Sequence, residues 1–200
     1  MNIHQLSVNY IQEHDRILVR INTTAGEELR LWFTRRLTLG LMPMVEKIVA
    51  EWVAKQEAVN SPAISPTAAA DAQTQAMLAE FKREESLQKS DFQTPYKAPN
   101  ALPLGPEPLL VTELSVTPLP SGQLQLSFNE KLPLDNGEPH PNPRGFRVAL
   151  EQKLVHGFVH LLQKAVETSQ WAGVSVTNEP EPALPGEGNM GGGERPKYLN

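Results

Sequence analysis

The sequence predicts an α+β fold in which a β-β-β-α unit occurs twice. Three observations carry this prediction: where the prolines lie, where apolar and polar residues alternate, and how two parts of the chain agree in order and spacing. We expect an internal repeat that forms one pseudo-twofold domain of antiparallel sheet plus two helices. A long Pro-rich linker would separate the copies, and a disordered C-terminal tail would follow them.

Prolines divide the chain into four stretches. Pro43 is the only proline in the first 60 residues, none lies in 146–179, and the other 17 lie in 61–145 and 180–200. Proline removes a backbone donor and fixes φ, so it is scarce inside helices and central strands. The sequence therefore predicts a first repeat at 1–56, a Pro- and Ala-rich linker at 57–108, a second repeat at 109–171 and a flexible tail at 172–200.

Each repeat begins with three segments that alternate between apolar and polar residues, as strands with one covered face do. They lie at 5–8, 16–21 and 29–33 in the first repeat, and at 113–116, 123–128 and 146–150 in the second. Short turns join several of them, residues 22–26 among these, so we expect antiparallel pairing.

A helix with an apolar stripe is expected after the third strand of each repeat. The second helix, at 151–170, and its counterpart at about 35–55 both show this spacing; the stripe residues are Leu154, Phe158, Leu161, Leu162 and Ala165, and Leu37, Leu41, Val45, Ile48 and Trp52. Pro43 is expected to kink or divide the first helix. A single repeat is too small to bury much, so the two are expected to share a core.

The linker contains a further candidate helix at 67–90, which has no proline or glycine and carries a small apolar patch of Met77, Leu78 and Phe81. An isolated helix of this length is marginal in water. It is therefore expected either to dock on the domain or to fold on binding another molecule.

The composition excludes several classes of function. The chain has no cysteine, which excludes disulfides and thiol chemistry, and its net charge of −5 counts against a general polyanion binder. No apolar run is long enough for a membrane span, and the first residues have neither the basic start nor the apolar stretch of a signal peptide. We expect a cytoplasmic protein without membrane contact.

No motif for catalysis or for a cofactor is present. The sequence lacks a Gly-x-Ser-x-Gly elbow, a dinucleotide-binding glycine pattern and a phosphate loop. His156 and His160 have a spacing that suits a metal, but the glutamate of a zinc hydrolase is missing between them, and Gln152, Gln163 and Glu167 continue the same polar stripe. We expect a solvated helix face there, no metal, no cofactor and no enzyme.

The most informative surface is the face of the first sheet opposite its core. Alternation puts Arg16, Leu18, Arg20, Arg30 and Trp32 on it. Arginine beside an aromatic ring anchors protein interfaces, and it also holds single-stranded nucleic acid through phosphate pairing and base stacking. The matching face of the second repeat is blander, with Gln123, Gln125, Ser127, Arg147 and Ala149, which favours protein contact.

In architecture alone, the repeated sheet-plus-helix plan resembles the PUR and Whirly single-strand binders. Those have four strands per repeat and are more basic, whereas this sequence shows three strands and an acidic balance. The resemblance implies only the nucleic-acid alternative.

The leading interpretation is a non-catalytic adaptor or structural protein that uses the outer face of the first-repeat sheet to contact a protein partner or a second copy of itself. A single-stranded nucleic-acid binder using the same face is the alternative. The last residues follow a glycine spacer, so Arg195, Lys197, Tyr198 and Leu199 are candidates for a docking peptide.

Overall fold

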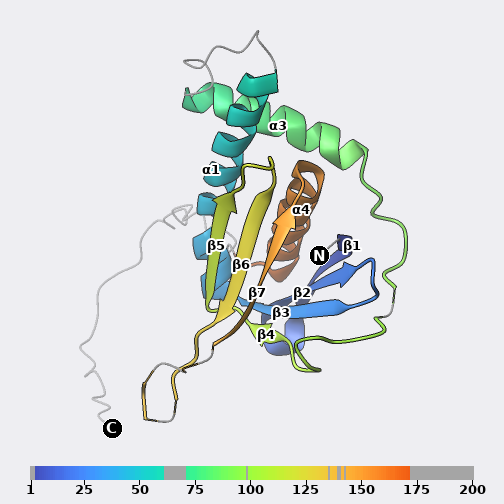
Figure 1. Cartoon of the computed structure of the whole chain (residues 1–200), viewed down its shortest axis with the longest axis vertical. Helices are drawn as coiled ribbons and strands as arrows, with labels where there is room; N and C mark the ends of the chain where they lie inside the picture. Colours follow the sequence, from blue (N-terminus) through green and yellow to red (C-terminus); the bar gives the residue numbers. More distant parts are fainter. Residues whose placement is uncertain are drawn as a thin grey trace, which may run out of the picture.

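The computed structural model describes residues 3–60, 71–97, 99–134, 136–138, 141 and 143–171. These described residues form two sheets and three α-helices (Figure 1), which confirms the α+β class. In chain order the elements are β1 (Ile3–Ile11), the 3-10 helix η1 (Gln12–His14), β2 (Arg16–Thr23), β3 (Glu28–Thr34), α1 (Arg35–Asn60), α3 (Ala72–Gln88), β4 (Leu109–Leu110), β5 (Glu113–Pro118), β6 (Leu124–Glu130), β7 (Arg144–Leu150) and α4 (Gln152–Ser169).

The first sheet has the strand order β1-β2-β3-β4, and the second has the order β5-β6-β7. All pairs are antiparallel except β3 with β4, which run parallel with Leu31 beside Leu109. The short parallel strand β4 lies where the sequence predicts only the boundary between linker and second repeat. It attaches the start of the second half of the chain to the edge of the first sheet.

Period-2 alternation explains why β2 and β3 form a sheet with one covered face. The buried side chains are Ile17, Val19, Ile21, Leu29, Leu31 and Phe33, and each is at most 2% exposed. The residues that alternate with them are half-buried, namely Arg16, Leu18 and Arg20 on β2 and Arg30 and Trp32 on β3.

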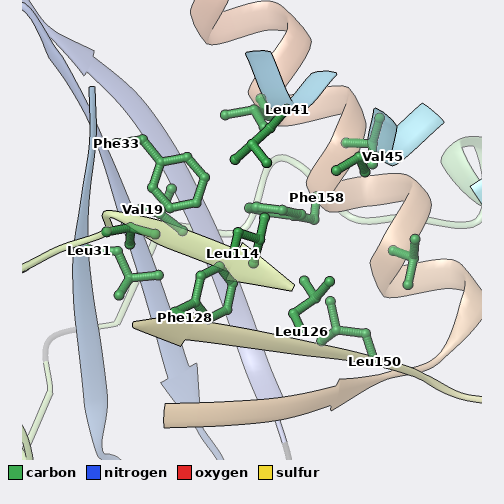
Figure 2. Packing of buried hydrophobic residues seen from close by; sticks show 14 of the residues in the cluster. Val19, Leu31, Phe33, Leu41, Val45, Leu114, Leu126, Phe128, Leu150 and Phe158 are labelled. Atoms are coloured by element: carbon green, nitrogen blue, oxygen red, sulfur yellow. The ribbon is translucent and has the colours of Figure 1, made fainter. Parts of the chain in front are cut away.

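One hydrophobic cluster joins both sheets and the helices α1 and α4. Figure 2 shows the centre of this cluster, where Phe33 of the first sheet faces residues from the second half of the chain. The ring centroid of Phe33 lies 6.1 Å from that of Phe128 on β6 and 6.5 Å from that of Phe158 on α4. The two halves therefore bury their apolar faces against each other.

Pro43 was expected to kink or divide the first helix. The helix α1 runs through Pro43 as one element, so a division does not occur. It also extends to Asn60, beyond the residue at about 55 where the sequence predicts its end. Its buried residues include Leu41, Val45 and Trp52, which belong to the predicted stripe.

The helix α3 lies within the predicted range 67–90 and packs on α1 and α4 (Figure 1). The Asp71 carboxylate caps it by accepting a hydrogen bond from the Thr74 amide. Lys82 pairs with Glu57 of α1 at 3.3 Å, and Arg83 donates a hydrogen bond to Gln163 of α4 at 3.1 Å. In this structure the helix is docked on the domain.

Candidate interaction surface on the first sheet

The five predicted surface residues lie together on the outer face of the first sheet. Cross-strand pairing places Arg20 opposite Arg30, and Leu18 opposite Trp32, on neighbouring strands β2 and β3. Arg16 lies at the end of the same row, opposite Thr34. All five side chains are half-buried, whereas their neighbours along each strand point into the core. Something besides the sheet therefore covers part of this face.

The cover is a stretch of the chain that follows α3, residues 91–97, which we call the connector. The side-chain amide of Gln5 on β1 donates to the Pro95 carbonyl at 3.1 Å, and its oxygen accepts from the Lys97 amide at 2.9 Å. The Tyr96 ring lies against Arg20, with the guanidinium carbon 4.5 Å from the ring centroid. The connector thus lies over the Arg20 half of the face.

Side chains of the protein engage both arginines of this half. Glu28 is 2% exposed, and its Oε1 lies 2.5 Å from Nε of Arg30, two residues along β3. Arg20 donates a hydrogen bond to the Ser7 hydroxyl of β1 at 3.1 Å. Burial and the neighbouring Glu28 carboxylate raise the pKa of Tyr96, which keeps its phenol neutral. Both arginines are therefore engaged by groups of the protein itself.

The other half of the face, which is also half-buried, lies beside His14 of η1 and Leu110 of β4. Leu18 and Trp32 form a cross-strand pair, and Leu110 of β4 lies beside Trp32 in the ladder. The His14 ring packs on Trp32 with 5.2 Å between ring centroids. Within the described residues, Arg16 forms no ion pair with a carboxylate. We call this half, defined by Arg16, Leu18 and Trp32, the open patch, because no described hydrogen bond or ring contact joins it to the connector. It combines apolar side chains with a cation that pairs with no described carboxylate.

Sequence reasoning missed the connector and the role of Glu28. A signal for Glu28 was present, because the period of two puts it on the same face as Arg30 and Trp32. No local pattern predicts that Tyr96 covers this face, because it lies 76 positions after Arg20 in the chain. The contact is long-range, so alternation within the strands does not encode it.

The structure corrects the expected surroundings of His156. This residue was expected on a solvated stripe, but it is 2% exposed because α3 packs over its side of α4. His160 is half-buried and lies beside Phe92, with 5.7 Å between ring centroids. Among the described residues no group of three or more metal-ligating side chains gathers.

The proposed docking residues Arg195, Lys197, Tyr198 and Leu199 lie outside the described residues, as does the rest of 172–200. Across the described ranges, no helix has the length and apolar character needed to cross a membrane. Comparisons with protein-family models, with curated proteins and with solved structures find no match for this chain.

Proposed function

We propose that this protein is a non-catalytic adaptor or structural protein that binds a protein partner, or a second copy of itself, through the outer face of its first sheet. The observation that carries the proposal is the half-buried Leu18–Trp32 pair beside Arg16, which forms no ion pair with a carboxylate of the described residues. Tryptophan and arginine around an apolar centre are the side chains on which protein interfaces concentrate their binding energy.

The state of the two other arginines favours protein over nucleic acid. A single-strand binder needs cations that are free to pair with phosphates. Arg30 already pairs with Glu28, and Arg20 is covered by Tyr96 and bonded to Ser7. Both guanidinium groups are therefore held by other side chains of the protein. On this face, Arg16 is the described arginine that remains available to a partner.

The same cluster argues against catalysis on this face. Glu28 is its one buried acid, and its carboxylate is paired with Arg30 and lies beneath the connector. A general acid or base must lie within hydrogen-bond reach of its substrate. Oε1 of Glu28 already pairs with Arg30, and its Oε2 is buried away from solvent, where a substrate would have to reach it.

The proposal includes the finer architecture predicted from the sequence: an internal repeat with pseudo-twofold symmetry, a linker between the copies and a tail after them. It is supported by the element order, since three strands precede one long helix in β1-β2-β3-α1 and again in β5-β6-β7-α4. The proposal also includes a cytoplasmic location, as predicted from the sequence. Subcellular fractionation tests this location.

Fluorescence anisotropy of a labelled single-stranded oligonucleotide, at low and at high salt, separates protein binding from the nucleic-acid alternative. We expect no salt-sensitive binding by the full chain. Binding that weakens with salt and is lost in Trp32→Ala and Arg16→Ala would overturn the proposal, because counterion release on phosphate contact produces that salt dependence. Arg147→Ala, on the other sheet, is the matched control for the arginine.

Light scattering tests the self-association version. If the open patch joins two copies, the full chain is a dimer at micromolar concentration and Trp32→Ala is a monomer. A wild-type monomer eliminates this version and leaves a different protein as the partner.

A further inference from the structure

A groove of about 620 Å³ runs beside β1. Its walls are β1, Ser90 with the connector, and α4. Six consecutive residues of β1, from His4 to Asn9, line it. Successive side chains of a strand point to opposite faces, so a groove that touches all six follows the edge of the strand.

The strand β1 is the outer strand of its sheet, with β2 on one side. No described strand pairs with its other side, along which the groove lies. An unpaired edge presents backbone donors and acceptors that suit an added strand. Several peptide-binding domains use such an edge to bind an extended segment.

The wall formed by α4 is basic at both ends and open in the middle. Lys153, Gly157, His160 and Lys164 all line the groove at helical spacing. Lys164 lies eleven positions after Lys153, which is about 16 Å along a helix. About five residues of extended chain span the same distance. A Cβ built on Gly157 meets no atom within 4 Å, so there is open space above the backbone at this point.

The groove carries an excess of positive charge. Among the described residues neither Lys153 nor Lys164 forms an ion pair with a carboxylate. The carboxylate that lines the groove is Asp91, and it accepts hydrogen bonds from the amides of Gln93 and Thr94 and from the Thr94 hydroxyl. These bonds, and to a lesser degree the charge of Lys153, lower the pKa of Asp91, and the bonds hold its carboxylate to the connector.

We propose that the groove binds an extended acidic segment of a partner protein, which adds as a strand to the free edge of β1. Carboxylates about five residues apart would pair with Lys153 and Lys164, and an apolar side chain would occupy the space above Gly157. This site shares no residue with the open patch, although Asn9 of the groove pairs with Leu18 across the strands, and its test does not depend on the proposed function.

The probe is a capped peptide of about six residues, alternating valine and threonine with a glutamate at each end. Titration of the ¹⁵N-labelled full chain is followed by NMR. We expect amide shifts concentrated at 4–9 and 152–164. Replacing both lysines by glutamine, in a Lys153→Gln and Lys164→Gln double variant, should weaken binding about tenfold or more. A peptide with lysine at each end should not bind.

Gly157→Leu fills the groove, and it should abolish the shifts while the remaining amide spectrum keeps its native dispersion. Gly40→Leu is the matched control, since Gly40 is also a helical glycine with open space at its Cβ, but on α1; it should bind like the wild type. Trp32→Ala should also bind normally. The proposal is overturned if the acidic peptide causes no shifts at millimolar concentration, if the lysine peptide binds equally well, or if Gly157→Leu leaves binding unchanged.

Discussion

Glu28 is the residue on which the covered half of the outer sheet face depends. Glu28→Gln preserves the shape of the side chain but leaves the Arg30 guanidinium without its anion. We expect the free energy of unfolding in urea to fall by about 1–3 kcal/mol. Glu27→Gln is the matched control, because Glu27 is half-buried and forms no ion pair within the described residues; its change should stay within about 0.5 kcal/mol. Equal losses in both variants would contradict this role for Glu28.

His156 makes the stability of the protein depend on pH. Burial, and to a lesser degree the charge of Arg83, lowers its pKa from 6.5 to about 4, while Glu80 acts in the opposite direction. Between these two pH values the unfolded chain binds the proton and the folded chain does not. Stability should therefore be complete above pH 6.5 and decline as the pH falls toward 4.

NMR titration of the His156 imidazole checks the shifted pKa directly, and urea unfolding at several pH values checks the loss of stability. His156→Gln should remove the part of the loss that comes from this group. A midpoint near the ordinary value of 6.5 would contradict the buried state of the imidazole.

At the scale of elements, the β2–β3 hairpin and the chain near residue 100 meet at Gly26. This glycine has a φ of 79°, and an added Cβ would lie 2.5 Å from the Asn100 side-chain amide. Gly26→Ala should therefore cost about 1 kcal/mol or more. Gly40→Ala should instead stabilise by about 0.5–1 kcal/mol, because Gly40 is exposed within α1 and its Cβ meets nothing. Thermal unfolding measures both, and a stabilising Gly26→Ala would show that this turn is not constrained.

The strands and helices in both halves of the chain were predictable because their apolar periods are local. Ile17, Val19 and Phe33 are buried as alternation requires, and α4 buries Phe158 and Leu162 as its stripe requires. No local period of this kind predicts which residues of separate elements come into contact.

Three features of the candidate surface depend on such meetings. Tyr96 covers Arg20, the parallel strand β4 joins β3, and α3 buries His156. Each contact joins parts of the chain that are far apart, so no period within one element indicates it. The face was therefore predictable from alternation, whereas the division into a covered half and an open patch was not.

At the scale of the molecule, one core couples the two halves. Phe33 packs against Phe128 and Phe158, which belong to the second half of the chain. Phe33→Ala should lower the free energy of unfolding by about 3–5 kcal/mol, and signals from both sheets should disappear in one transition. Phe81→Ala, at a 64% exposed site on α3, is the matched control with a change of about 0.5 kcal/mol or less. Separate transitions for the two sheets would contradict a shared core.

Site-specific photo-crosslinking in cells tests the proposed function most directly. A photoreactive amino acid replaces Leu18 in the centre of the open patch, and Gln125 on the outer face of the second sheet serves as the control position. We predict a single defined protein adduct, or a dimer of this chain, from position 18 and not from position 125, and its loss when Trp32→Ala is added. Adducts of equal yield from both positions, or an adduct that survives Trp32→Ala, would contradict the account.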